Sequence, residues 1–194
     1  PAFFRAAEAV GVIPVPGMEL ETAENIHVVC LFGTLSGAMS FGEEVAGRRF
    51  PIKNRPEIYG EQLIVDHEDN ILGTDPKLLV VATGIGLTDL PEIVDRHGGV
   101  CYPAHIHRPS NGIIAILGDI PPDFPTECVE LNDMSKREEL MKSHPSLSGK
   151  KFLSGSDAHR LDAIRDAEHT IYLDGDTPDE IRKNLIRSIK LGRI

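Results

Sequence analysis

Two residues of metal-ligand type lie close together in the segment Lys151–His159, which reads KFLSGSDAH. Its apolar start predicts a short buried strand, and the small residues that follow predict a turn presenting Asp157 and His159 together. A carboxylate oxygen beside an imidazole nitrogen suits a divalent zinc, manganese or iron ion. The structural alternative is that Asp157 caps a short helix and His159 is an ordinary surface residue.

Further candidate ligands fall at the ends or edges of other predicted strands, namely Glu19, His27, His105 and His107. A histidine that opens an apolar strand, as His27 does, needs a hydrogen-bond partner or a ligand role. Residues two apart in a strand point to the same side, so His105 and His107 could both reach one cavity. Each residue alone has a structural explanation. Together they favour a divalent metal site, because strand C-termini meet on one face of a parallel barrel.

The elements that would position these residues mostly alternate between helix and strand, which indicates an α/β fold with a mainly parallel sheet. The run Ile26–Phe32, with His27 near its start, is otherwise apolar, as expected for a strand buried on both faces. Capping boxes are predicted at Asp89 with Glu92 and at Ser135 with Glu138. The expected helices are Ala2–Val10, Leu35–Arg48, Asp89–His97, Asn111–Leu117, Ser135–Lys142 and a last one capped by Thr177; the expected strands include Val12–Val15, Ile26–Phe32, Val100–His107, Cys128–Leu131, the KFL segment and His169–Leu173.

Length and composition indicate one ordinary globular domain over residues 1–194, with an insertion at about 50–76 that contains a hairpin. No apolar run approaches the length of a membrane span. Three widely spaced cysteines without a CxxC motif are typical of buried thiols in a reducing cytoplasm. The net charge of −10 argues against a non-specific nucleic-acid binder. It does not exclude an anionic substrate, because bound metal ions reverse the sign of a local site.

Several of these segments, in order along the chain, resemble motifs of the PHP (polymerase and histidinol phosphatase) domain family. They are Pro16–Glu19, the histidine that opens the next strand, Pro103–His105 and, most specifically, Gly155–His159. The resemblance covers most of the chain. It implies a distorted (β/α)7 TIM-like barrel that holds two or three divalent metal ions (Zn, Mn or Fe) at its C-terminal strand ends. The family's opening HxH motif and the following Asp-His turn would lie before Pro1, so we expect the first strands to be missing here.

The resemblance also assigns roles to the candidate residues. Glu19 resembles the carboxylate that bridges two metals, and His27 and His105 resemble imidazole ligands of one metal. Asp157 and His159 resemble the ligands on the last strand, where they bind different metals. His107 has no firm counterpart in the family, so its role as a ligand, a ligand support or a substrate contact stays open.

These features lead us to expect a metal-dependent phosphoesterase that hydrolyses a phosphomonoester or phosphodiester with a metal-activated water. Glu19, Asp157 and His159 would be its catalytic residues. Arg108 would clamp the phosphate, because a guanidinium matches phosphate bidentately, although a solvated loop residue is the alternative. His107 would be a second substrate contact. The substrate would be a small phosphorylated molecule or a short nucleotide, and the oligomeric state stays open.

Two other functions are compatible with the same residues. An amidohydrolase-like enzyme would use similar ligands, but it would usually carry a metal-binding lysine, and no lysine stands at a suitable strand end. A degenerate metal-binding barrel could instead serve as a regulatory or interaction module. In that case, replacing Asp157 would lower stability without changing any turnover.

Overall fold

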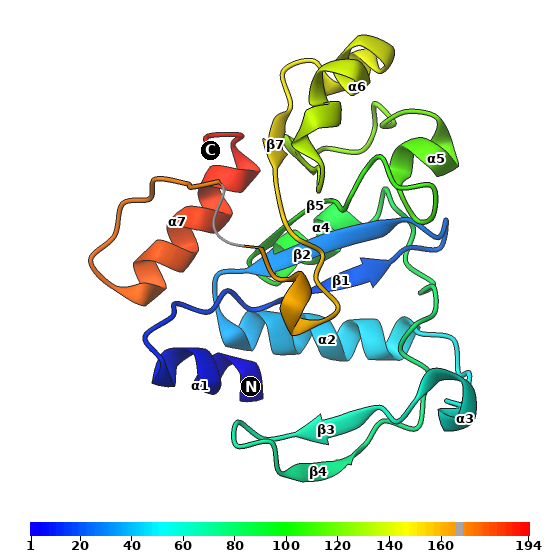
Figure 1. Cartoon of the computed structure of the whole chain (residues 1–194), viewed down its shortest axis with the longest axis vertical. Helices are drawn as coiled ribbons and strands as arrows, with labels where there is room; N and C mark the ends of the chain where they lie inside the picture. The colour runs from blue at the N-terminus through cyan, green and yellow to red at the C-terminus, as the bar shows by residue number, and fades with distance from the viewer. Residues whose placement is uncertain (166–168) are drawn as a thin grey trace.

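Three antiparallel strands form the centre of the structure, a computed structural model that describes residues 1–165 and 169–194 (Figure 1). The strand order is β1-β2-β5, and two further pairs, β3-β4 and β6-β7, share no hydrogen-bonded strand with this sheet. The strands are β1 (Gly17–Glu21), β2 (His27–Phe32), β3 (Leu63–Val65), β4 (Ile71–Thr74), β5 (Gly99–Pro103), β6 (Cys128–Glu130) and β7 (Lys151–Leu153). The helices are α1 (Ala2–Ala9), α2 (Leu35–Arg48), α3 (Pro56–Tyr59), α4 (Leu90–Arg96), α5 (Ile113–Leu117), α6 (Arg137–Ser143) and α7 (Pro178–Lys190).

The central strand β2 has two different faces. Val28, Cys30 and Phe32 are fully buried, whereas the alternate residues, beginning with His27, are only partly buried. The expectation that this run is buried on both faces is therefore wrong. The sheet keeps one face in the core and opens the other, as antiparallel sheets commonly do. His27 lies on this open face.

The core lies on the buried face of this sheet and extends under α2, α4 and the loop after β5. Phe32 packs on Phe41 of α2 with their ring centroids 5.0 Å apart. Ile106 and Ile113, from the loop after β5 and from α5, are completely buried in the same cluster. Burying such side chains contributes roughly 1.5–3 kcal/mol each. This packing fixes the loop that carries His105.

The pair β6-β7 is parallel, with Glu130 opposite Leu153 at its end. Helix α7 packs behind it through Ile189, which is buried against Tyr102 and Cys128. The helix begins as the sequence predicts, with Thr177 as N-cap and Pro178 in the first turn, and Glu180 completes a capping box. The α7 helix thus ties the parallel pair to the central sheet.

The predicted insertion contains the expected hairpin, formed by β3 and β4. In Figure 1 it projects beyond α2 at the bottom of the view. Its apolar side chains Leu63, Ile64, Ile71 and Leu72 are all exposed. The hairpin is thus placed outside the core, while the chain that returns from it runs back toward β1.

The three cysteines are free and buried, as the sequence predicts. Cys30 and Cys101 stand directly opposite each other in the β2-β5 register. Burial raises the pKa of the Cys101 thiol to about 12 and that of Cys128 to about 11. These thiols are therefore protonated at neutral pH.

The fold differs from the expected one in its sheet. The class is mixed α/β, but only β6-β7 is parallel among the described strands, so the expectation of a mainly parallel sheet is wrong. The described strands do not close into a barrel. Val12–Val15 is not a strand, because Pro14 and Pro16 supply no N–H donors there. His169–Leu173 is not a strand either and pairs with no described neighbour.

Two expected helix caps are also wrong. Asp89 is the N-cap of α4, but its side chain makes no capping hydrogen bond. Ahead of α6, Asp133 caps the 3-10 turn Met134–Lys136 by accepting a hydrogen bond from the backbone N–H of Ser135, and α6 itself has no side-chain cap. Asp133 takes the capping position that was expected for Ser135. Its carboxylate accepts from the N–H two residues further along the chain, which is a common turn for aspartate. In the part of the chain that is described, no helix is both long and apolar enough to cross a bilayer.

Replacing the cap of α7 tests how far this helix stabilises the domain. Thr177→Ala should lower the free energy of unfolding by about 1 kcal/mol, because it leaves the N–H of Glu180 without its acceptor. Thr177→Ser keeps the hydroxyl and should be nearly neutral. Urea denaturation followed by circular dichroism measures both, and equal stability of the two variants would contradict the prediction.

Candidate metal centre

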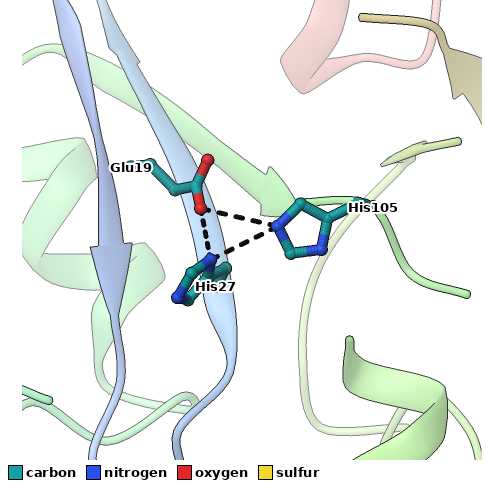
Figure 2. Close-up of side chains that lie close together, drawn as sticks. All are labelled: Glu19, His27 and His105. Atoms are coloured by element: carbon teal, nitrogen blue, oxygen red, sulfur yellow. Dashed lines mark hydrogen bonds and ion pairs between the residues drawn. The ribbon is translucent and has the colours of Figure 1, made fainter. Parts of the chain in front are cut away.

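A carboxylate and two imidazoles meet on the open face of the central sheet. Figure 2 shows Glu19 of β1, His27 of β2 and His105, which follows β5, pointing toward one another. His27 Nδ1 lies 3.3 Å from His105 Nε2, and His105 Nε2 lies 3.5 Å from Oε1 of Glu19. His27 also makes a direct ion pair with Glu19. These donor atoms, which all lie within 4.8 Å of one another, form the candidate metal centre.

Strand register brings Glu19 and His27 together. Glu21 is the partner of His27 across the β1-β2 pair, and Glu19 is the partner of Val29. Glu19 and His27 are thus diagonal neighbours on the same face, close enough for long side chains to touch. They are partly open to solvent, with 37% of the Glu19 side chain and 27% of the His27 side chain exposed.

A turn, and not a strand, supplies His105. The strand β5 ends at Pro103, and the N–H of Ala104 still donates to the carbonyl of His27 at 3.0 Å. His105 then adopts a positive φ of 29°, which is uncommon outside glycine. Its side chain is 1% exposed. This turn aims His105 at the sheet. Both histidines follow β5 and neither lies in a strand, so the expectation that strand geometry places them on one side is wrong.

The charges of the centre are strongly coupled. Hydrogen bonds from His105 and His27 hold the pKa of Glu19 far below its ordinary value of 4.5. The hydrogen bond to Glu19 raises the pKa of His27 above 6.5, against the opposing effect of burial. Glu19 is therefore ionised at any physiological pH, and protons and cations compete for the nitrogen of His27.

The donor set fits a divalent transition metal. Two imidazole nitrogens that bind one tetrahedral zinc ion at about 2.0–2.1 Å lie roughly 3.3–3.4 Å apart, which matches the separation of His27 and His105. Carboxylate oxygen with imidazole nitrogen is suited to zinc, manganese or iron. The second nitrogen of His105, Nδ1, is buried without a hydrogen-bond partner among the described residues.

The remaining predicted site residues lie outside this close group. Asp157 is outside the close group, but its charge contributes to raising the pKa of His27. Its carboxylate pairs with the Arg108 guanidinium, and only 15% of its side chain is exposed. His159 is 77% exposed, and its Nδ1 lies 2.9 Å from the carbonyl oxygen of Asp157. His107 does not belong to the close group either, and its pKa is lowered chiefly by burial.

A further acidic residue, Glu130, lies at the end of β6 beside the centre and was not predicted. Its Oε2 accepts a hydrogen bond from the N–H of His105 at 3.3 Å. Burial raises its pKa, and the charges of Glu19 and Asp157 raise it further. Gly155 passes so close that a Cβ there would stand 2.5 Å from Oε1 of Glu130. The only sequence signal was one glutamate inside the apolar run Cys128–Leu131.

Comparisons with known proteins show a resemblance of fold. The sequence matches no protein-family profile and no curated protein. Among solved structures, the chain is similar to the novel lesion-specific endonuclease PfuEndoQ from Pyrococcus furiosus, at 20% sequence identity and a TM-score of 0.52. The match covers 90% of this chain and 38% of the endonuclease chain. The present chain therefore spans less than two fifths of that protein.

The Glu19–His27 pair predicts a particular pH dependence of stability. Ionised Glu19 with protonated His27 stabilises the fold fully between about pH 4.5 and 6.5. This stabilisation is lost as pH rises through the raised pKa of His27 or falls through the lowered pKa of Glu19. In the presence of chelator, the stability difference between the wild type and Glu19→Gln should peak in that window. A difference that stays constant up to about pH 9 would contradict the pairing.

Glu130 should matter as a hydrogen-bond acceptor and not as a charge. Glu130→Ala leaves the buried N–H of His105 unpaired and should destabilise the fold by about 1–3 kcal/mol. Glu130→Gln keeps an acceptor and removes a charge that burial disfavours, because a raised carboxyl pKa means that ionisation above about pH 4.5 costs stability. At pH 7 this variant should be at least as stable as the wild type in chemical denaturation. Equal losses in both variants would refute this role.

Proposed function

We propose that this chain carries the metal centre of a PHP-like phosphoric ester hydrolase with a distorted-barrel architecture. The observation that supports the proposal most is the convergence of one carboxylate and two imidazoles from three separate segments. The order of the PHP-like motifs along the sequence supports it independently. The fold resemblance to an endonuclease is consistent with hydrolysis of a phosphate ester.

Glu19, His27 and His105 would hold one divalent ion, and Asp157 and His159 would contribute to a second or third. Bound divalent metals supply a Lewis acid and lower the pKa of water toward neutrality. Zinc, manganese and iron all fit the donor types. Glu130 would orient His105 through its backbone N–H, a supporting role that commonly affects metal sites by 10–100-fold.

Arg108 would act on the phosphate and on Asp157 together. Its guanidinium already pairs with the Asp157 carboxylate, which holds both side chains next to the centre. A guanidinium has five N–H donors, so contact with a carboxylate leaves donors for a phosphate oxygen. Its positive charge would stabilise the negative charge that develops during phosphoryl transfer. His107 would contact the substrate from the same turn.

A basic pocket beside β7 favours a substrate with more than one phosphate. The cavity, of about 540 Å³, is lined in part by Arg137, Lys150 and Lys151. Arg137 stacks over the ring of Phe152, and Lys150 donates to the carbonyl of Thr126. Their charges are therefore not cancelled by those contacts. The similar solved structure is a lesion-specific endonuclease, so a phosphodiester of a nucleotide chain is the substrate class we propose first. We further propose that the protein acts in the cytoplasm, where its three cysteines would stay free thiols.

Metal content and turnover test this function directly. The purified chain should bind two or three divalent ions per molecule and hydrolyse bis(p-nitrophenyl) phosphate faster than p-nitroacetanilide, an amide of similar size. Chelation should abolish the activity, and Mn²⁺ or Zn²⁺ should restore it. His105→Gln should lower turnover by about 100-fold or more, because it removes a ligand, a larger loss than a supporting residue causes.

His67→Gln is the matched control, because His67 lies in the turn of the β3-β4 hairpin. It should keep full turnover and metal content. An active protein without metal would refute the proposal. Asp157→Asn distinguishes an enzyme from a binding module. If the variant loses turnover with only a small change in stability, the protein is an enzyme. If the wild type has no turnover and the variant loses stability, the protein is a binding module.

A further inference from the structure

The basic pocket beside β7 has a local charge opposite to that of the whole protein. It is bounded by Arg137 of α6, by Lys150 and by Lys151 of β7, and no aspartate or glutamate stands among the described residues that line it. The chain as a whole holds 30 acidic residues and only 20 lysines and arginines. Positive charge gathered in a hollow attracts anions, so the pocket is a candidate anion site.

The three cations are not neutralised within the protein. None of the ion pairs formed by residues 1–165 and 169–194 includes any of them. Arg137 contacts the ring of Phe152, with its guanidinium carbon 5.0 Å from the ring centroid, and Lys150 donates to the carbonyl oxygen of Thr126. Both of these partners are uncharged. Each cation therefore keeps its full charge and further N–H donors for a ligand.

The other groups in the wall favour an oxyanion over a nucleobase. Ser154 and Thr170 add two hydroxyl groups. The phenyl ring of Phe152 already has the Arg137 guanidinium over one face, so it offers little surface on which a base could stack. Phosphate oxygens accept hydrogen bonds from guanidinium, ammonium and hydroxyl groups alike. These donors together suit a phosphate group.

The segment that follows β7 joins the pocket to the candidate metal centre. Ser154 lines the pocket, and the next residue, Gly155, packs against Glu130. Glu130 in turn accepts the hydrogen bond from the N–H of His105. Asp157, proposed above as a metal ligand, lies three residues beyond Ser154, so their Cα atoms are at most about 11 Å apart. In Figure 1 this segment leaves β7 and runs down the view toward β1. A short stretch of chain thus connects the pocket to one side of the centre.

We propose that the basic pocket binds a phosphate of the nucleotide chain that flanks the cleaved phosphodiester on one side. This inference rests on the proposed function, because it assumes that a phosphodiester is hydrolysed at the metal centre. It adds that the substrate is long enough to carry a flanking phosphate, and that only one of the two flanks contributes. Phosphate contacts position a strand without reading its bases, so this contact is independent of sequence.

Binding is tested with inorganic phosphate, which cannot be hydrolysed. The zinc-loaded chain, labelled with ¹³C at its methionine methyl groups, gives four signals, and Met134 is the methionine that lines this pocket. Phosphate at millimolar concentration and constant ionic strength should shift the Met134 signal saturably and leave that of Met39, on α2, unchanged. Lys151→Gln should weaken this binding about fivefold, because it removes one of three charges.

Two further variants complete the binding test. Lys142→Gln is the matched control, because Lys142 lies on α6 but does not line the pocket, and it should bind phosphate as the wild type does. Lys151 is exposed, so its replacement should leave the fold intact. If Lys151→Gln nevertheless fails to fold, Arg137→Gln should show the same loss of phosphate binding.

The one-sided contact is tested with hexathymidylate, which has two phosphates on each side of its central one. In two analogues, the two phosphates of one side are replaced by uncharged methylphosphonates, which leaves the central ester cleavable. The wild type should cleave the central ester of one analogue about tenfold less efficiently in kcat/KM than that of the parent, mostly through KM, and the other analogue nearly as well as the parent. In Lys151→Gln the two analogues should differ by about twofold at most, whereas Lys142→Gln should keep the tenfold difference.

The outcomes separate the two proposals. A shift of Met134 by phosphate, without hydrolysis of any phosphate ester, would keep the pocket as an anion site and overturn the proposed function. Hydrolysis of bis(p-nitrophenyl) phosphate but not of hexathymidylate, or equal cleavage of both analogues, would overturn the flanking-phosphate site and keep the proposed function. In that case a shift of Met134 would mark an adventitious ion only. Absence of any shift of Met134 would also overturn this site.

Discussion

The contact of one ionised carboxylate with two imidazoles is the interaction on which the rest of this structure depends. Two histidine nitrogens only 3.3 Å apart would repel each other if both were protonated. Glu19 relieves that repulsion, and its own pKa falls as a result. A positive charge between the three side chains, either a proton or a metal ion, therefore stabilises this arrangement best.

Every neighbouring element contributes to holding these three side chains. The β1-β2 register fixes two of them, and the turn after β5 fixes the third. Glu130, at the end of β6, binds the backbone of that turn, and Gly155 lies against Glu130 because no side chain fits there. Two sheets that share no hydrogen-bonded strands, β1-β2-β5 and β6-β7, are thus joined at the candidate centre. A perturbation in either of them would be expected to reach it.

Local patterns in the sequence predicted local structure well. Thr177 followed by Pro178 and two acidic residues predicted the start of α7, and the hairpin in the insertion was expected from its flanking apolar runs. The sequence also singled out Glu19, His27 and His105 as candidate ligands, because of their residue types and their places at the ends or edges of predicted strands. The structure brings these three together and holds His159 at the surface.

What the sequence did not predict depends on contacts between distant segments. Strand direction is one example, because an apolar run such as Ile26–Phe32 fits a parallel or an antiparallel neighbour. His107 was placed beside His105 on the assumption of a strand, but a positive φ at His105 turned the chain. Glu130 was overlooked because its role depends on an N–H 25 residues away.

The opposed cysteines at the middle of the sheet give the structure an internal reporter. Cys30 on β2 and Cys101 on β5 are shielded from solvent, and their raised pKa values leave almost no reactive thiolate. An alkylating reagent can reach them only when these two strands separate. The same strands carry His27 and lead into His105, so the rate of alkylation would follow the opening of the candidate metal centre itself.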